Sequence, residues 1–327
     1  MVKIAVAGGT GNVATCMLKE AIASNQHDIV IFTRSAPSKP HPSPRVSYFQ
    51  VDYTSRDALT TALRGVHTVL SFFVVHLDVD NIGQKNLIHA SIAAGVSRFA
   101  PSEWSIASYS GVPSYVVKDE VRSYLEDLDA KGELKGMQYC LFQPSIFMDY
   151  FAHPYPLEPD LITWPFFIDF ENRRAMLLDE GDQPIVLTAM QDDAVILAKA
   201  LKDTERPWPK LGGIRGCQTT INELIALGKK LRGGEWSIER VSGADIKEGE
   251  LKTSWIPQFS HPTMPEDQQD VFSKAFVVMF MQAILNGSWN VSAEWNERFP
   301  DHKFIGLEEY LTKAWEGKPY PCQGLAY

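Results

Sequence analysis

The stretch Lys3-Ile-Ala-Val-Ala-Gly8-Gly-Thr-Gly11-Asn-Val-Ala14 decides the fold class of this chain of 327 residues. Lys3–Ala7 is a short apolar run, typical of a buried strand, and it leads directly into a glycine-rich turn. Behind the turn, residues 13–23 repeat apolar side chains at helical spacing. The stretch therefore predicts a strand, a tight loop and a helix in immediate succession.

The same alternation continues through the first 150 residues. Strand patterns are predicted over residues 28–32, 46–51, 68–75, 97–100 and 138–142. Helix patterns are predicted over residues 80–94 and 118–130, and over a segment that a capping box at Thr54–Asp57 opens and Gly65 ends. Repeated strand–helix–strand units with short connections predict an α/β protein with a Rossmann-type, doubly wound parallel sheet.

After Pro144 the character of the sequence changes. Aromatic residues and prolines crowd residues 150–170. Residues 174–178 and 184–188 flank Asp179-Glu-Gly-Asp182 and predict a β-hairpin, and helices are predicted over 192–201, 220–231 and 268–285. We expect two domains: a dinucleotide-binding Rossmann domain over residues 1–150, and a smaller, aromatic-rich substrate-binding region over residues 151–327 packed on the sheet edge.

Composition excludes several classes of protein. The 31 Lys and Arg residues against 40 Asp and Glu residues give a net charge of −9, which argues against nucleic-acid binding because phosphates attract clustered cations. The longest apolar run is shorter than the roughly 20 residues of a membrane span. Cys16, Cys140, Cys217 and Cys322 are widely spaced and indicate free thiols rather than a metal site or disulfides. A cytoplasmic protein is expected.

The glycine loop indicates a phosphate-binding turn. Gly8 and Gly11 let backbone N–H groups approach a pyrophosphate, and Ala14 is small enough for the helix to pack on the strand. Thr10, Asn12 and Val13 complete the expected contact loop. An ordinary strand–helix turn is the alternative, since such turns also use glycine.

The end of the second predicted strand indicates which dinucleotide binds. An NAD site places Asp or Glu there to accept from the ribose 2′-hydroxyl, but this chain has Thr33, Arg34 and Ser35, with Lys39 nearby. A guanidinium can hold a 2′-phosphate with two parallel hydrogen bonds. NADP(H) is therefore the expected cofactor, with a solvated surface arginine as the alternative.

Two further strand ends contribute candidate cofactor contacts. Asp52 follows the third strand, where its carboxylate either accepts from the adenine amino group or caps its own loop. Ser71, Phe72 and Phe73 end the fourth strand and are expected to run along the pyrophosphate and the nicotinamide ribose.

These motifs together resemble a known family. Gly8-x-x-Gly11-x-x-Ala14, Asp52 with the Leu59–Val66 segment, Gln84 and Arg98-Phe-x-Pro-Ser-Glu103 are similar to the isoflavone-reductase-like and NmrA-like atypical short-chain dehydrogenases. The resemblance covers residues 1 to about 150 well. One departure is Trp104-Ser105, where the family has an aromatic residue followed by glycine.

The resemblance implies a catalytic role for Lys118. Ordinary short-chain dehydrogenases use Tyr-x-x-x-Lys, but here Tyr115 lies three residues before the lysine, not four, so that dyad is out of register. The isoflavone-reductase branch keeps a lone lysine, which Lys118 with Asp119 and Arg122 matches. Such a lysine holds the nicotinamide ribose, and proton transfer to or from the substrate is a further possibility. A plain helix-surface lysine is the alternative.

Aromatic residues are the candidate substrate contacts. These are Trp104, Tyr115, Phe147, Tyr150 and Phe151. Together with Trp164, Phe166 and Phe167 they favour a flat, apolar ligand, although each one is equally typical of a core, and His153 is as typical of a loop as of a proton donor.

Three functions follow from the resemblance. The leading one is an NADPH-dependent reductase of a carbonyl, an activated C=C or a quinone-methide-like group in a small aromatic or polyketide-like metabolite. A dinucleotide-binding redox sensor without turnover is the alternative from another class. A non-redox isomerase or dehydratase that retains the cofactor is the third. The sequence leaves the substrate and the oligomeric state open.

Overall fold

The computed structural model describes residues 1–35, 39–259 and 266–320. It divides into two compact units that alternate along the chain. Unit 1 comprises Met1–Pro144, Gln191–Ile214 and Ser292–His302, and unit 2 comprises the described residues of Ser145–Met190, Arg215–Val291 and Lys303–Tyr327. The sequence-based division at residue 150 instead assigns 191–214 and 292–302 to the second region.

Unit 1 is built on a six-stranded parallel sheet in the order β3-β2-β1-β4-β5-β6. The strands are β1 (Lys3–Ala7), β2 (Asp28–Thr33), β3 (Val46–Gln50), β4 (Thr68–Ser71), β5 (Arg98–Ala100) and β6 (Gln138–Tyr139). Because the strand order reverses between β1 and β4, the carboxyl ends of these two strands open the crevice in which such sheets bind ligands. The predicted Rossmann-type, doubly wound sheet is confirmed.

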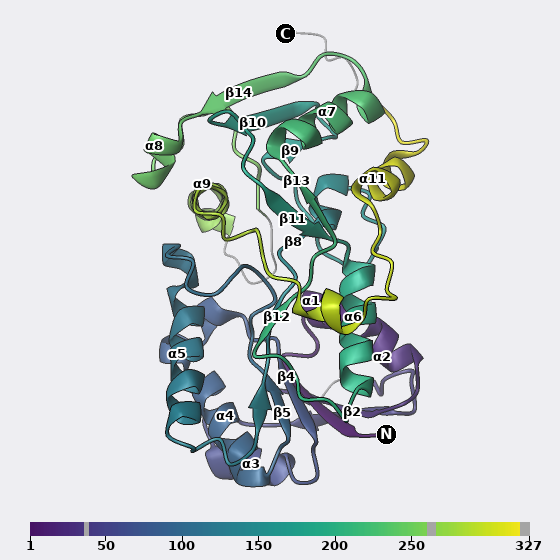
Figure 1. Cartoon of the computed structure of the whole chain (residues 1–327), viewed down its shortest axis with the longest axis vertical. Coiled ribbons are helices and arrows are strands. Elements are labelled where there is room, and N and C mark those ends of the chain that lie inside the picture. The colour runs from purple at the N-terminus through teal and green to yellow at the C-terminus, as the bar shows by residue number, and fades with distance from the viewer. Residues whose placement is uncertain (36–38, 260–265, 321–327) are drawn as a thin grey trace. The chain divides into compact units, whose positions relative to one another are not determined.

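Helices cover both faces of this sheet (Figure 1). Helices α3, α4 and α5 lie on one face, and α1, α2 and α6 lie on the other. Their bounds are α1 (Asn12–Met17), α2 (Lys19–Ala23), α3 (Arg56–Ala62), α4 (Ile82–Ala94), α5 (Val116–Ala130) and α6 (Met190–Lys202), with α10 (Glu294–Arg298) also in this unit. Short 3-10 turns are η1 (Val75–Leu77), η2 (Val79–Asn81) and η3 (Pro113–Tyr115). The core contains fully buried aliphatic and aromatic side chains such as Ala5, Leu59, Leu87, Phe99 and Leu125.

Local signals in unit 1 are mostly correct, with four differences. The strand predicted over 68–75 ends at Ser71, and the helix predicted over 13–23 is divided at Leu18 into α1 and α2. The predicted capping box at Thr54–Asp57 is wrong by one residue, because the hydroxyl of Ser55 accepts the hydrogen bond from the backbone N–H of Ala58 at 3.3 Å. The strand predicted over 138–142 is interrupted at Cys140. Its first part, β6, pairs with β5, and its second part, β7 (Leu141–Gln143), pairs with β12 (Leu211–Gly213).

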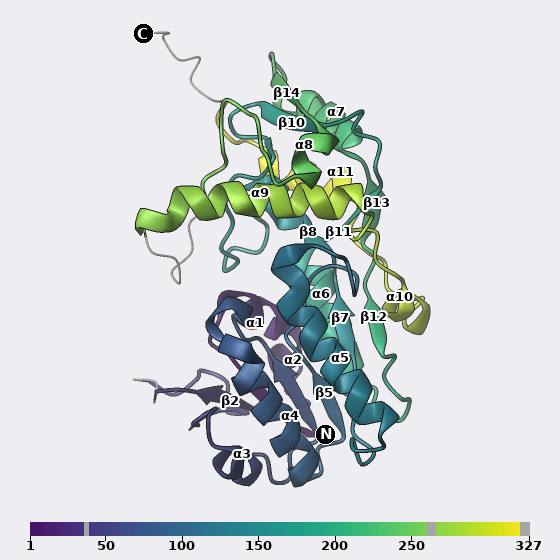
Figure 2. The same ribbon diagram turned by 90° about the vertical axis from the view of Figure 1, so that its left-hand side faces the viewer.

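Unit 2 contains two small sheets, in the orders β14-β10-β9 and β13-β11-β8. Its strands are β8 (Ile146–Phe147), β9 (Ile168–Asp169), β10 (Arg174–Leu178), β11 (Ile185–Thr188), β13 (Cys217–Thr219) and β14 (Ser237–Val241). Its helices are η4 (Met148–Ala152), α7 (Ile221–Arg232), α8 (Gly243–Lys247), η5 (Glu266–Gln268), α9 (Gln269–Leu285) and α11 (Leu307–Trp315). Helix α9 is the long helix of Figure 2.

The hairpin predicted over residues 174–188 is wrong. β10 pairs in parallel with β14, and β11 pairs antiparallel with β13, so the two strands belong to different sheets. The side-chain amide of Asn222, on α7, donates to the carbonyl of Glu180 at 2.6 Å and to Asp182 at 2.7 Å. These hydrogen bonds hold the acidic turn against α7. Both β10 and β11 pair with strands that come later in the chain.

Cys16, Cys140 and Cys217 are free thiols, while Cys322 lies outside the described residues. Within the described ranges, no helix combines the length and the apolar character needed to cross a membrane.

Candidate functional site

The glycine loop lies against the end of β4. Gly8 has a φ of +70°, and a Cβ built on it would lie 2.6 Å from the backbone oxygen of Phe72. The N–H of Phe72 donates to the carbonyl of Ala7 at 2.8 Å, so the two strand ends are joined directly. Gly8 is therefore required by the fold itself, since both its backbone conformation and its contact distance exclude a side chain.

Gly8→Ala is expected to destabilise the protein by roughly 2–4 kcal/mol, because strain at positive φ and overpacking against backbone each cost about 1–3 kcal/mol. Urea unfolding measures this loss. Gly11→Ala is the matched control, because Gly11 has a φ of −71° and its Cβ would meet only the Gly8 oxygen, at 3.1 Å. Equal unfolding midpoints for Gly8→Ala and the unmutated protein would contradict this assignment.

Gly11 is the N-cap of α1 and is exposed. Its N–H donates to the carbonyl of Gly8 at 3.0 Å, which closes the loop, and Thr10 beside it is exposed as well. Asn12 and Val13 form the first turn of α1, where no acidic side chain and no side-chain cap is found. The positive end of the helix is thereby left open to an anion.

The predicted 2′-phosphate residues lie at the end of β2. Arg34, Ser35 and Lys39 are exposed. The backbone carbonyl of Arg34 accepts from the Gln50 amide at 3.2 Å, whereas its guanidinium has no hydrogen bond or ion pair within the described part of the chain. Thr33 is buried, and its hydroxyl lacks a partner among the described residues. The exposed guanidinium suits the predicted role of Arg34, which stays a prediction.

The carboxylate of Asp52 accepts hydrogen bonds from its own loop. Its Oδ1 accepts from the N–H of Thr54 at 2.9 Å and from the Thr54 hydroxyl at 2.7 Å. The hydroxyl bond, followed by the backbone bond, lowers the pKa of this carboxyl. Of the two predicted roles, loop capping is observed, and adenine recognition stays a prediction.

Residues 71–73 connect β4 to the neighbouring loop. The buried hydroxyl of Ser71 has no partner among the described residues, while its carbonyl accepts from the Trp104 indole N–H at 2.7 Å. The Phe72 ring stacks on Trp104 with centroids 4.3 Å apart, and the Phe73 ring meets Tyr53 edge-on at 4.7 Å. The site thus has a buried aromatic wall at the end of β4.

Residues of the Arg98–Glu103 motif form hydrogen bonds with different parts of unit 1. Arg98 donates to the carbonyls of Asp203 at 2.6 Å and Arg206 at 2.7 Å, just beyond the end of α6. The N–H of Ser102 donates to Gln84 at 2.9 Å, and its hydroxyl donates to the Phe73 carbonyl at 2.8 Å. The segment after β5 is therefore fixed to α4 and to the end of β4.

Trp104 precedes Ser105, which stands where the family that the sequence resembles has glycine. The φ of Trp104 is +45°, a conformation that costs of the order of 1 kcal/mol or more for a residue other than glycine. Its stacking and its bond to Ser71 offset that cost. The ring is only 8% exposed, so Trp104 is first of all a packed wall, and its predicted contact with substrate stays a prediction.

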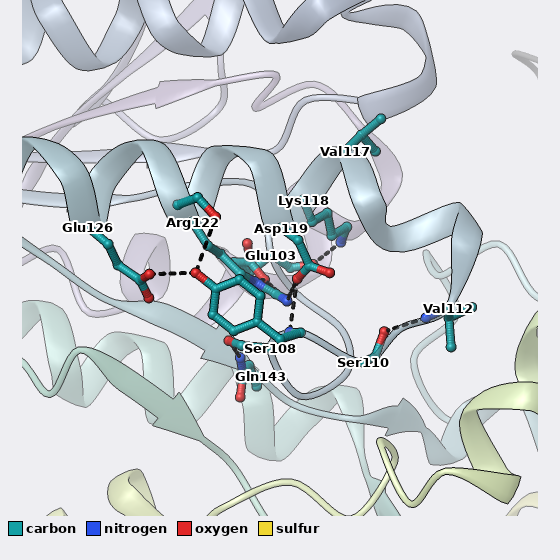
Figure 3. Close-up of polar contacts among 12 residues, drawn as sticks. Glu103, Ser108, Ser110, Val112, Val117, Lys118, Asp119, Arg122, Glu126 and Gln143 are labelled. Atoms are coloured by element: carbon teal, nitrogen blue, oxygen red, sulfur yellow. Dashed lines mark hydrogen bonds and ion pairs between the residues drawn. The ribbon is translucent and has the colours of Figure 1, made fainter.

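Lys118 lies on the first turn of α5 and points at the loop that follows β5 (Figure 3). Its ammonium donates to the backbone carbonyl of Glu103. Burial lowers the pKa of Lys118 to about 8, the Glu103 carboxylate acts to raise it, and the Arg122 guanidinium acts to lower it further. With such a pKa, the side chain can donate a proton as the ammonium and accept one as the neutral amine near neutral pH.

Tyr115 adjoins the lysine. The Lys118 ammonium lies 5.5 Å from the centroid of its ring, and its hydroxyl is 2.8 Å from that of Ser105. Burial raises the pKa of Tyr115 to about 12. Ser105 was not predicted from the sequence, because the partner of a hydroxyl ten residues away depends on how the loop folds.

The other predicted substrate contacts lie in unit 2 and pack among its own aromatic side chains. Phe147 and Tyr150 have ring centroids 5.9 Å apart, Tyr150 lies 4.6 Å from Trp164, and Phe151 lies 5.4 Å from Phe166. The half-buried His153 contacts the Thr163 hydroxyl at 3.0 Å. Their roles toward substrate stay predictions.

Comparison with known proteins identifies the family. The model of the NmrA-like family matches residues 2–311. The chain belongs to the NmrA-like family. The predicted resemblance is confirmed. Among curated relatives of this NmrA-like protein, the oxidoreductase swnN of Metarhizium robertsii is 26% identical, and the match covers 96% of this chain and 98% of that protein.

Solved structures agree on the fold. Leucoanthocyanidin reductase of Vitis vinifera, solved with NADPH, superposes with a TM-score of 0.69 at 17% identity, covering 96% of this chain and 99% of that one. An isoflavone reductase gives a TM-score of 0.66 at 19% identity, covering 95% and 98%. These likenesses establish the shared architecture of the NmrA-like chain.

Proposed function

We propose that this NmrA-like protein is an NADPH-dependent reductase. It transfers hydride to a carbonyl, an activated C=C or a quinone-methide-like group of a small, largely apolar metabolite of aromatic or polyketide-like character. The observation that carries the proposal is the fixed, partly buried ammonium of Lys118 at the carboxyl edge of the sheet. The name of the oxidoreductase relative and the NADPH held by the structural neighbour support it.

The residues at this edge fit a nicotinamide dinucleotide. The uncapped first turn of α1 suits the pyrophosphate, and the guanidinium of Arg34, unpaired among the described residues, suits a 2′-phosphate. The hydroxyls of Thr33 and Ser71, at the ends of β2 and β4, have no partner in the described ranges and suit a ligand rich in polar groups. When bound, NADPH supplies the hydride.

The chain's own residues supply position and a proton. Lys118 donates hydrogen bonds to the ribose side of the site, and its lowered pKa lets it deliver a proton to the oxygen or carbon that becomes basic during reduction. Phe72 and Trp104 keep this edge apolar, which strengthens the interactions of the ammonium by excluding water.

The direct test is turnover. The purified protein is incubated with NADPH and a panel of aromatic enones, ketones and quinones, and the absorbance of the reduced nicotinamide is followed. Reduction of at least one compound that depends on the protein supports the proposal. Tight NADPH binding without turnover of any compound would contradict it and favour a dinucleotide sensor.

Arg34→Ala is expected to weaken NADPH binding about tenfold or more and to leave NADH binding unchanged, since a charge-assisted hydrogen bond contributes about 1.5–3 kcal/mol. Calorimetric titration with both dinucleotides measures the change. Arg64→Ala, which removes another exposed arginine of the same unit, is the control. If the unmutated protein binds NADPH and NADH equally well, Arg34 does not read the 2′-phosphate.

A further inference from the structure

A buried ion pair lies directly beside Lys118. Nε of Arg122 donates to Oε2 of Glu103 at 2.9 Å, and a second guanidinium nitrogen contacts the same carboxylate. The side chain of Arg122 is fully buried and that of Glu103 is 1% exposed. The same residue, Glu103, presents its backbone carbonyl to the Lys118 ammonium, so one residue links the pair to the lysine (Figure 3).

The pair also fixes the loop that carries this carbonyl. Another nitrogen of Arg122 contacts Asp119, whose Oδ1 accepts from the backbone N–H of Tyr109 at 2.9 Å. The Tyr109 hydroxyl donates to Glu126, which lies one turn beyond Arg122 on α5, at 2.5 Å. The loop from Glu103 to Tyr109 is thereby attached to the same face of α5 from which Lys118 projects.

A buried ion pair contributes little to the free energy of unfolding. Removing two charges from water costs free energy, and replacing a buried pair by well-packed apolar side chains is often neutral or stabilising. Here, however, Glu103 both pairs with Arg122 and holds the Lys118 ammonium through its backbone carbonyl. Apolar side chains could not replace the charges of this arrangement. The arrangement fixes both the direction of the ammonium and the charges around it.

We propose that Glu103 and Arg122 are positioning residues for Lys118: their ion pair holds the Glu103 carbonyl as the fixed acceptor of the ammonium and sets the charges that the ammonium meets. This inference rests on the proposed reductase function, because it assigns the pair a task in the same site. Neither residue needs to touch substrate or cofactor.

The charges that face Lys118 can be named. From η3, Tyr115 presents its ring, and from α5, Arg122 presents its guanidinium, while Asp119 is engaged by Arg122. From the loop after β5, Glu103 presents its carboxylate. The turns before α4 also pack against α5; there Asp78 accepts from the N–H groups of Gly83 and Gln84, and His76 and Asp80 are exposed. Glu103 and Arg122 thus act on the proton of Lys118 in opposite directions.

Opposite effects give a sharp test. In Glu103→Gln the carboxylate charge is lost, and the pKa of Lys118 is expected to fall by about one unit. In Arg122→Met the guanidinium charge is lost, and the pKa of Lys118 is expected to rise by about one unit. Loss of stability without these shifts would show that the pair does not set the charges that the ammonium meets.

The measurement does not depend on turnover. The full-length protein is labelled with acetic anhydride over a range of pH, and mass spectrometry quantifies acetylation at Lys118, which reacts only as the free amine. Asp129→Asn is the control, because it removes a carboxylate from the far end of α5 that pairs with Lys210, and it is expected to leave the pKa of Lys118 unchanged. Shifts of the same sign in Glu103→Gln and Arg122→Met, or no shifts, would overturn the proposal.

Two further variants separate loss of folding from loss of positioning. Glu103→Leu/Arg122→Met replaces both charges by apolar groups and is expected to fold, as circular dichroism reports, with Lys118 no longer held and kcat reduced at least tenfold. Arg122→Lys keeps a charge but loses the bidentate geometry, and is expected to restore the pKa of Lys118 more fully than kcat. Full kcat in the double variant would contradict positioning. Opposite shifts in a protein that reduces no compound would leave the positioning intact and remove only the reductase function.

Discussion

Lys118→Ala is expected to reduce NADPH-dependent turnover by about 10²–10⁴-fold, the usual contribution of a positioned acid or base. The ammonium is fixed by the Glu103 carbonyl, and its pKa is lowered to about 8, mainly by burial. A protonated lysine is needed to donate, so the rate of the reductive direction should decline as the pH rises through about 8. Steady-state kinetics over a pH series measures both effects.

Two substitutions separate proton transfer from ribose binding. Lys118→Arg keeps the charge but does not release a proton in the working range, so NADPH affinity should return while the rate stays low. Lys131→Ala removes an exposed lysine just beyond the other end of α5 and should leave both unchanged. Unreduced turnover in Lys118→Ala would show that the lysine is not a catalyst. Comparable losses of affinity and rate, without a change in pH profile, would indicate ribose binding alone.

Gly11→Val is expected to raise the Kd for NADPH roughly 100-fold or more while the protein stays folded. The branched side chain would cover the first turn of α1, where the N–H groups meet the pyrophosphate. Each charge-assisted hydrogen bond lost there costs about 1.5–3 kcal/mol, and two such losses reach this factor. Calorimetric titration with NADPH gives the affinity, and urea unfolding gives the stability.

The contrast with Gly8 makes this test specific. A side chain at Gly8 would collide with the backbone of Phe72, whereas a side chain at Gly11 meets only the Gly8 oxygen. Gly8→Ala should therefore lose stability, and Gly11→Val should lose binding. If Gly11→Val kept both normal stability and normal NADPH affinity, the pyrophosphate would not bind at this loop.

Much of unit 1 could be predicted because its signals are local. The apolar run of Lys3–Ala7, the glycines behind it and the helical spacing of residues 13–23 each extend over one element. Strand–helix alternation then leaves few ways to arrange a parallel sheet, since crossovers are right-handed. The fold class was predicted from these features, and the family from short motifs such as Arg98-Phe-x-Pro-Ser-Glu103; both predictions are confirmed.

The hairpin over residues 174–188 failed for a physical reason. Two short apolar runs around an acidic turn predict two strands, but they do not determine which strands pair. β10 and β11 each find a partner more than 25 residues away along the chain, β14 and β13 respectively, while Asn222 holds the turn between them. Pairing of this kind depends on what the rest of unit 2 offers, and no short stretch of sequence contains that information.

The candidate site divides in the same way. The sequence by itself determined the glycine loop, the basic end of β2 and the position of Lys118, because each depends on residue type at a short spacing. Only the tertiary structure decided that Gly8 serves the fold while Gly11 faces outward. It also decided that Glu103, 19 residues before Arg122, forms a buried pair with it beside the lysine. Burial and the charges that surround an ammonium are properties of the packed chain, since side chains distant in sequence create them.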